Sequence, residues 1–138
     1  MEENVIILNM ENSESKKRVV LVVEDEPALL RAISDSLKKE GLEVIEAKNG
    51  EEGLNIALDK SPDLILLDII LPKINGLELL KKLRSDARGK ETPVIILTNL
   101  DDPLKVSEAM QYNVYDYFTK SNIDLSKIAE RVKSKLLF

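Results

Sequence analysis

The stretch Leu64-Ile65-Leu66-Leu67-Asp68 runs four apolar residues directly into a carboxylate. A short, continuous apolar run of this kind is typical of a strand that is buried on both faces, and Val94–Leu97 has the same character. Strands buried on both faces belong to parallel sheets that carry helices on each side. The two runs therefore predict a parallel sheet covered by helices.

The rest of the chain alternates short apolar runs with helical patterns. The predicted strands are Val19–Val23, Leu42–Glu46, Leu64–Leu67, Val94–Leu97 and Tyr115–Phe118. Apolar residues three and four apart predict helices over Pro27–Lys39, Glu51–Lys60, Gly76–Arg84, Asp102–Tyr112 and Leu125–Leu136. Five strands alternating with five helices predict a doubly wound α/β domain with a five-stranded parallel sheet.

Length and composition suit one domain with a tail. The chain has 138 residues, of which 43% are hydrophobic and 33% charged. We expect residues 1–17 to form a mobile tail, because Glu11–Lys17 is polar, and residues 18–138 to form the domain. The apolar group Val5–Leu8 leaves open an added edge strand or a docking segment.

Composition also excludes several kinds of site. The chain has no cysteine and no histidine, which excludes disulfides, Cys/His zinc sites and Ser-His-Asp triads. A net charge of −5 argues against a general affinity for nucleic acid or anionic lipid. No apolar run reaches the ~20 residues that span a bilayer, and acidic Glu2 and Glu3 stand where a signal peptide would be basic. The sequence therefore predicts a cytoplasmic protein.

Three carboxylates stand at the ends of two predicted strands. Glu24 and Asp25 follow Val19–Val23, and Asp68 follows Leu64–Leu67. If these strands are neighbours in a parallel sheet, the three acids meet at one edge, where a bound cation relieves their repulsion. The cluster therefore predicts a site for a hard cation, Mg²⁺.

Mg²⁺ prefers oxygen ligands in octahedral geometry and keeps several waters. We expect Asp25 and Asp68 to be direct ligands and Glu24 to act through water or by orienting the site. The backbone carbonyl of Ile70, two residues beyond Asp68, is expected to complete the set.

Two further polar residues follow strands of the same predicted sheet. Thr98 ends the fourth strand and Lys120 follows the fifth. Each alone has an ordinary explanation as a cap or a surface charge, but five such residues past strand ends favour one site. Asp68 is then the expected nucleophile for a phosphoryl group, whose charge Mg²⁺ and Lys120 neutralise.

The same residues carry a family resemblance. From Arg18 to about Lys135 the sequence resembles a response-regulator receiver domain, similar to the single-domain chemotaxis and sporulation-relay regulators. The linked motifs are Val23-Glu24-Asp25-Glu26-Pro27, Pro62-Asp63, Asp68-Ile69-Ile70-Leu71-Pro72, Gly76, Thr98 and Asp116-Tyr117-Phe118-Thr119-Lys120. The resemblance implies a flavodoxin-like fold with strand order 2-1-3-4-5 and five flanking helices.

The resemblance also implies a function in two-component systems. A sensor histidine kinase or phosphotransfer protein would pass a phosphoryl group from its phosphohistidine to Asp68 with Mg²⁺. The domain would catalyse its own phosphorylation and autodephosphorylation and would not be a conventional turnover enzyme. Thr98 and Tyr117 would act as the switch. They would change a face formed by helix 102–112, strand 115–118 and helix 125–136, which would bind a downstream protein or a second copy of the chain.

The chain departs from the family pattern at several positions. Ser121 follows Lys120 where the family commonly has proline, and Asn99 follows Thr98 where a small residue is usual. Ile70 and Leu100 are apolar at sites that often tune hydrolysis, which predicts slow loss of the phosphoryl group, because neither side chain orients a water.

Other functions fit the residues less well. A haloacid-dehalogenase-type phosphatase needs a second acid where Ile70 stands, and a flavodoxin-type module needs a Gly-rich or Ser/Thr-rich phosphate loop where Glu24-Asp25-Glu26 stands. The alternative that remains is a phosphorylation-independent receiver fold that serves as a protein-binding scaffold. A free-standing regulator, a relay intermediate and a domain of a larger protein all stay open.

Overall fold

A computed structural model describes residues 17–99 and 103–136. Its five strands pair in parallel in the order β2-β1-β3-β4-β5, which confirms the order implied by the resemblance. The strands are β1 (Val19–Val23), β2 (Glu43–Ala47), β3 (Leu64–Asp68), β4 (Val94–Thr98) and β5 (Asp116–Thr119).

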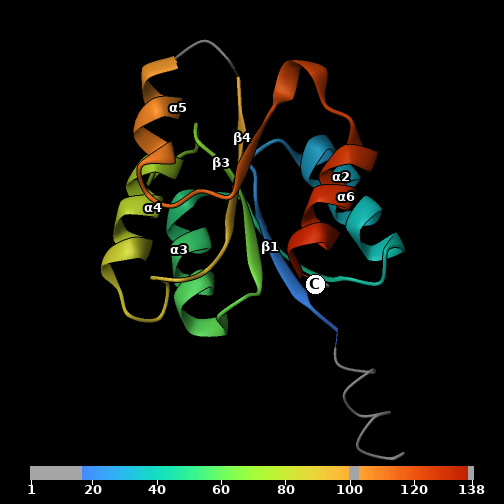
Figure 1. Ribbon diagram of the computed structural model, residues 1–138, viewed down its shortest axis with the longest axis horizontal. Helices are drawn as coiled ribbons and strands as arrows, with labels where there is room; N and C mark the ends of the chain where they lie inside the picture. Colours follow the sequence, from blue (N-terminus) through green and yellow to red (C-terminus); the bar gives the residue numbers. More distant parts are fainter. Residues whose placement is uncertain (1–16, 100–102, 137–138) are drawn as a thin grey trace, which may run out of the picture.

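Helices cover both faces of the sheet. The helices are α2 (Pro27–Lys39), α3 (Gly50–Lys60), α4 (Gly76–Ser85), α5 (Pro103–Met110) and α6 (Leu125–Leu136). Figure 1 shows α2 and α6 on one side of the sheet and α3, α4 and α5 on the other. The bounds predicted from the sequence agree with these to within two residues, except that Asp102, expected to begin α5, lies outside the described residues.

Two apolar cores lie on the two faces of the sheet, as the continuous apolar runs predict. Every residue of β3 and of β4 is buried. Alternate residues of β1 point to opposite sides: Val20 and Val22 pack with α2 and α6, whereas Leu21 and Val23 pack with α3 and α4. Burial on both faces fixes each central strand and so fixes where its carboxyl end lies.

The expected helix boundaries have local causes in the structure. Asn49 and Asn75 cap α3 and α4 by accepting hydrogen bonds from the backbone N–H groups of Glu52 and Glu78, both at 2.8 Å. Gly41 follows the end of α2 with φ of 86°, a left-handed conformation that glycine adopts without strain.

Two sequence predictions concern the outer parts of the chain. The predicted tail, with its apolar group Val5–Leu8, lies outside the described residues except for Lys17. Among the helices that the structure describes, none is both long enough and apolar enough to cross a membrane.

Arg84, near the end of α4, joins two loops at the edge of the sheet where the strands begin. Its guanidinium donates hydrogen bonds of 2.7–3.3 Å to backbone carbonyls in two segments that are distant in sequence. The acceptors are Gly89, Lys90, Thr92, Tyr112 and Asn113. One planar, always charged group thereby holds the loop before β4 and the turn after α5.

We expect Arg84→Met to destabilise the domain by about 3 kcal/mol, because carbonyls that lose a charged donor are left unsatisfied. Urea unfolding followed by circular dichroism measures the change. Arg31→Met is the matched control, since Arg31 is exposed on α2, and it should cost less than about 0.5 kcal/mol. Equal stabilities of the two variants would contradict the role given to Arg84.

Candidate functional site

The sheet order brings the predicted acids together. β1 and β3 are neighbours, with Val23 opposite Leu67, so the residues that follow them emerge side by side. Carboxylate oxygens of Glu24, Asp25 and Asp68 lie within 4.8 Å of one another. The convergence expected from the sequence is therefore present at the carboxyl edge of the sheet.

The three acids differ in burial. Glu24 is 0% exposed and Asp68 is 2% exposed, whereas Asp25 is exposed. The Glu24 carboxylate accepts a hydrogen bond from the backbone N–H of Glu26 at 3.0 Å, and the Asp68 carboxylate accepts one from Ile70 at 3.1 Å. Each of the two buried carboxylates is thus held by the backbone N–H two residues further along the chain, while the third acid faces the solvent.

Lys120 reaches into this cluster from the end of β5. Its Nζ donates a hydrogen bond of 2.7 Å to Asp68 Oδ2 and lies 2.7 Å from Glu24 Oε1. The 3-10 helix η1 (Lys120–Asn122) begins at this lysine and was not predicted from the sequence. The ammonium therefore stands between the two buried carboxylates.

Glu26 also contacts the lysine, and this contact was not predicted from the sequence. Its Oε1 lies 3.7 Å from Lys120 Nζ, and its side chain is mostly exposed. The available signal was its position two residues after Glu24, at the same strand end. Glu26 adds a third negative charge beside the ammonium.

Burial and the nearby ammonium have opposite effects on the pKa values of the buried carboxyl groups. Burial raises the pKa of the Asp68 carboxyl above its usual value, although the hydrogen bond from Lys120 counteracts it. Burial raises the pKa of the Glu24 carboxyl in the same way. Burial also disfavours the charged form of Lys120, but its contacts with Asp68 and Glu24 outweigh this and raise its pKa. One ammonium does not fully compensate for burying two carboxylates.

The residues fit a hard divalent cation. All three candidate side-chain ligands are carboxylates, the donor type that Mg²⁺ prefers. Glu24 Oε1 is buried and, among the described residues, is paired with the Lys120 ammonium at 2.7 Å without a hydrogen bond of regular geometry. A carboxylate oxygen has more than one lone pair, so an ion or an ordered water can still bind it. Asp25, being exposed, lies on the side from which an ion would enter.

The loop after Asp68 carries the remaining expected ligand, the carbonyl of Ile70. The Ile70 side chain is 58% exposed, while Ile69 and Leu71 on either side of it are buried. The loop closes where the N–H of Gly76 donates to the Ile69 carbonyl at 2.7 Å. A side chain on Gly76 would overlap the Asp68 carbonyl, so this position requires glycine.

The two expected switch residues differ in burial, and neither hydroxyl is hydrogen-bonded to one of the three acids. Thr98 is buried at the end of β4, and its hydroxyl donates to the Asn99 carbonyl at 2.9 Å. Tyr117 on β5 is 43% exposed, so its ring is turned to solvent. All peptide bonds among the described residues are trans, including the one that joins Lys120 to Ser121.

Comparison with known proteins agrees with this geometry. Residues 20–133 match the family model described as the response regulator receiver domain. The chain is 33% identical over 117 residues to the DNA-binding dual master transcriptional regulator RpaA of Synechocystis, and 37% identical over 117 residues to the response regulator ArlR of Staphylococcus saprophyticus. These matches cover 85% of this chain but only 48% and 51% of the relatives, so the chain spans about half of their length.

A shorter relative is covered more completely. Protein PilH of Pseudomonas aeruginosa is 34% identical over 101 residues, which are 73% of this chain and 84% of PilH.

Solved structures give the same result. A CheY-like receiver domain protein from Methanospirillum hungatei matches with a TM-score of 0.81 and 27% identity, over 88% of this chain and 94% of that one. The receiver domain of the Francisella response regulator 1452 matches with a TM-score of 0.79 and 29% identity, over 88% and 98%. The fold, the acidic edge and these matches confirm the resemblance, and the chain belongs to the response-regulator receiver domain family.

Proposed function

We propose that Asp68 is the phosphoacceptor of this receiver domain. The observation that carries the proposal is the placement of its buried carboxylate 2.7 Å from the Lys120 ammonium and within 4.8 Å of two other carboxylates. Receiver domains take phosphoryl groups from histidine kinases or phosphotransfer proteins, which we propose as the donors here. The scaffold alternative is disfavoured, because a scaffold has no need of a buried acid held by a lysine.

The proposed reaction is a displacement at phosphorus. An Asp68 carboxylate oxygen attacks the phosphorus, the bond from phosphorus to the donor's imidazole nitrogen breaks, and the histidine leaves. Lys120 is already hydrogen-bonded to the attacking group and would neutralise charge on the phosphoryl oxygens. Autodephosphorylation by attack of water on the same phosphorus would restore the carboxylate and release phosphate.

Receiver domains bind Mg²⁺, and the acids of this chain fit that ion. We propose that Asp25, Asp68 and the Ile70 carbonyl hold it and that Glu24 orients the site. When bound, Mg²⁺ neutralises the carboxylates and the incoming phosphoryl oxygens.

We propose Thr98 and Tyr117 as the switch. The Thr98 hydroxyl now bonds to the neighbouring carbonyl and would turn toward phosphoryl oxygens on Asp68, since β4 lies next to β3. Tyr117 is exposed and would move inward into the space that Thr98 leaves. Both residues would then link the acid to the surface near β5.

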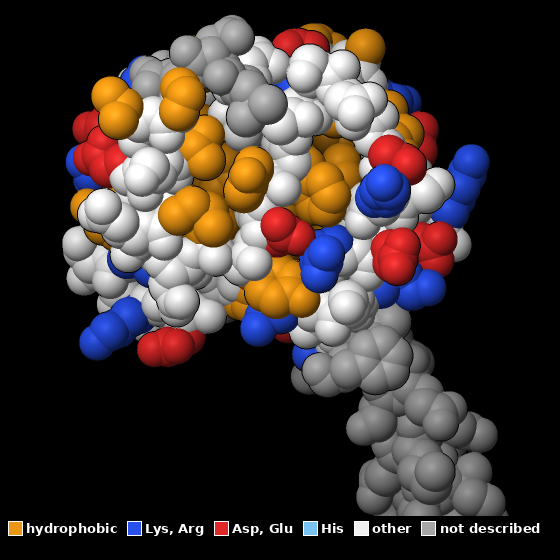
Figure 2. Space-filling view, turned by 45° about the horizontal axis from the view of Figure 1, so that its top comes forward, with side chains coloured by type: hydrophobic (Ala, Val, Ile, Leu, Met, Phe, Trp, Pro, Cys, Tyr) orange, Lys and Arg blue, Asp and Glu red, His pale blue; other side chains and the backbone are white. Residues whose placement is uncertain are grey.

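The proposed output face consists of α5, β5 and α6. Figure 2 shows hydrophobic side chains gathered on the half of the view that holds α5, with few charged side chains among them. The described large hydrophobic residues that are exposed include Leu104 on α5, at 80%, and Tyr117 on β5. Unpartnered apolar side chains of this size are typical of a surface that binds protein.

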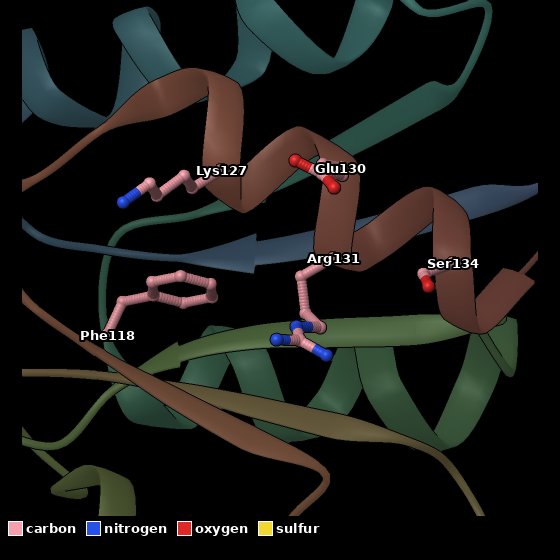
Figure 3. A pocket seen from close by; sticks show the side chains of 5 residues that line it. All are labelled: Phe118, Lys127, Glu130, Arg131 and Ser134. Atoms are coloured by element: carbon pink, nitrogen blue, oxygen red, sulfur yellow. The ribbon is translucent and has the colours of Figure 1, made fainter.

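A hollow of about 370 Å³ between β5 and α6 belongs to this face. It is lined by Phe118, Lys127, Glu130, Arg131 and Ser134. Figure 3 shows the Phe118 ring between the Lys127 and Arg131 side chains. A hollow lined by an aromatic ring together with basic and acidic side chains can receive a side chain of a protein partner. We propose a downstream protein or a second copy of the chain as that partner, in the cytoplasm where kinase domains of two-component systems act.

Phosphorylation by acetyl phosphate tests the central proposal. We expect one phosphoryl adduct by intact mass, formed with Mg²⁺ and absent when the ion is chelated, because the carboxylates otherwise repel the donor. Asp68→Asn keeps the size of the side chain but removes the nucleophilic oxygen, so it should form no adduct. Asp59→Asn, an exposed acid on α3, should be labelled like the unaltered protein. Labelling of Asp68→Asn to the same extent would contradict the assignment.

Removal of the Lys120 ammonium should affect the stability of the domain and its rate of phosphorylation differently when Mg²⁺ is added. We expect Lys120→Met to lose about 3–5 kcal/mol without Mg²⁺, because it leaves two buried carboxylates without their cation. Addition of Mg²⁺ should restore part of this stability in urea unfolding, while phosphorylation by acetyl phosphate stays severely slowed. The control Lys133→Met breaks an exposed ion pair with Glu40 and should cost less than about 1 kcal/mol with or without the ion. The outcome against the proposal is a Lys120→Met protein that Mg²⁺ does not stabilise.

The lifetime of the phosphoryl group tests the role of Ile70. We expect slow hydrolysis in the unaltered protein and severalfold faster loss of label in Ile70→Asn, because an amide side chain at the site can orient water. The comparison is Leu104→Asn, the same kind of change at an exposed position on α5, which should leave the lifetime unchanged. Equal lifetimes in all three proteins would show that the apolar side chain does not set the rate.

A further inference from the structure

The N-terminus of α3 lies directly against the loop between β3 and α4. Gly50, the first residue of α3, is buried, and a Cβ atom added there would overlap the carbonyl oxygen of Ile74. Its φ is not left-handed, so the backbone conformation alone does not require glycine at this position. The reason for glycine is the close approach of the loop.

A hydrogen bond and an ion pair join the same two segments. The backbone N–H of Gly50 donates to the Pro72 carbonyl at 3.3 Å. Lys73 Nζ lies 3.8 Å from Glu51 Oε2 at the surface. Loop carbonyls at a helix N-terminus are favourable, because the first N–H groups of a helix have no partner within it and carry partial positive charge. The N-terminus of α3 therefore packs against the loop and holds it in place.

This support bears on the functional site, because the loop leads from Asp68 through Ile70 to Gly76. Buried side chains of Ile69 and Leu71 anchor the first part of the loop in the core. Beyond them, Lys73 has a left-handed φ of 68°, and the carbonyls of Pro72 and Ile74 meet Gly50. The Ile70 carbonyl belongs to the peptide unit that joins Ile70 to Leu71, one residue before Pro72, so we expect a displacement of the second part to turn this carbonyl.

We propose that Gly50 is a positioning residue for the metal site: its missing side chain lets the loop seat on α3 and so sets the direction of the Ile70 carbonyl. The inference rests on the proposed function, in which that carbonyl is a ligand of Mg²⁺. Gly50 itself touches none of the reacting atoms. It acts through Pro72 and Ile74, which lie two and four residues beyond Ile70.

Mg²⁺ affinity of Gly50→Ala, measured by calorimetry with MgCl₂ alone, tests the inference. We expect binding about tenfold weaker than in the unaltered protein, the low end of the effect of residues that orient metal ligands. Alanine favours a helix over glycine by up to ~1 kcal/mol, so the helix itself gives no reason for a loss. Asp68→Ala removes a proposed ligand, so its Mg²⁺ affinity shows how large the loss is when the site is disrupted directly.

Gly89→Ala is the matched control. Gly89 is also buried, and a Cβ there would lie 2.8 Å from the backbone carbonyl oxygen of Leu83. Its N–H also donates to a backbone carbonyl, that of Asp86, at 3.0 Å. It lies beside the Arg84 network, where the strands begin, so the milder steric conflict there, chiefly with the Leu83 side chain, should lower stability and leave Mg²⁺ affinity unchanged. Equal affinities of folded Gly50→Ala and Gly89→Ala would overturn the inference.

A measurement on the unaltered protein covers the case in which Gly50→Ala does not fold. In an NMR titration with MgCl₂, the amide resonance of Gly50 should shift together with that of Ile70 and with the same midpoint, while that of Gly89 stays in place. A shift of Ile70 without one of Gly50 would overturn the inference and leave the proposed function intact. Absence of any Mg²⁺ binding would overturn both.

Discussion

The contact of Lys120 with two buried carboxylates is the constraint on which the rest of this structure depends. Taking Glu24 and Asp68 out of water costs several kcal/mol for each charge, and burial raises the pKa of both groups. The ammonium, 2.7 Å from Glu24 Oε1 and 2.7 Å from Asp68 Oδ2, offsets part of that cost. A protein-binding scaffold gains nothing from such an arrangement. A site that binds a cation and then a phosphoryl group needs carboxylates that are already in place to bind the cation.

The sheet makes this arrangement possible by holding the strand ends rigidly. Glu24 and Asp68 lie 44 positions apart in sequence and Lys120 lies 52 beyond Asp68, yet parallel pairing brings all three to one edge. The edge lies where strand order reverses between β1 and β3, the place where open α/β sheets leave a crevice for ligands. Apolar packing on both faces of β3 and β4 supplies the rigidity, and the loops beyond the strands supply the chemistry.

Sequence patterns predicted the elements and the acidic edge because both depend on local signals. The apolar runs of β3 and β4 and the carboxylates at strand ends are visible without tertiary contacts. The contact of Glu26 with Lys120 and the need for glycine at position 50 are not, because they depend on how distant segments pack. In sequence, Asn49-Gly50 indicates only a helix start, and nothing in it reveals the carbonyl of Ile74. The helix η1 was missed for a similar reason, since its three residues are too few to show periodicity.

Lys120 also connects Asp68 to the surface that the proposed switch residues reach. The lysine is the first residue of η1, which leads into α6, while the preceding β5 carries Tyr117 and Phe118. In the proposed reaction the ammonium would move from its present contact with Glu24 toward the phosphoryl oxygens. The ion pair of Arg131 with Asp116, at 2.9 Å, joins α6 to β5 beside the hollow between them. The group that compensates for buried charge is therefore also joined through the backbone to both β5 and α6 of the proposed output face.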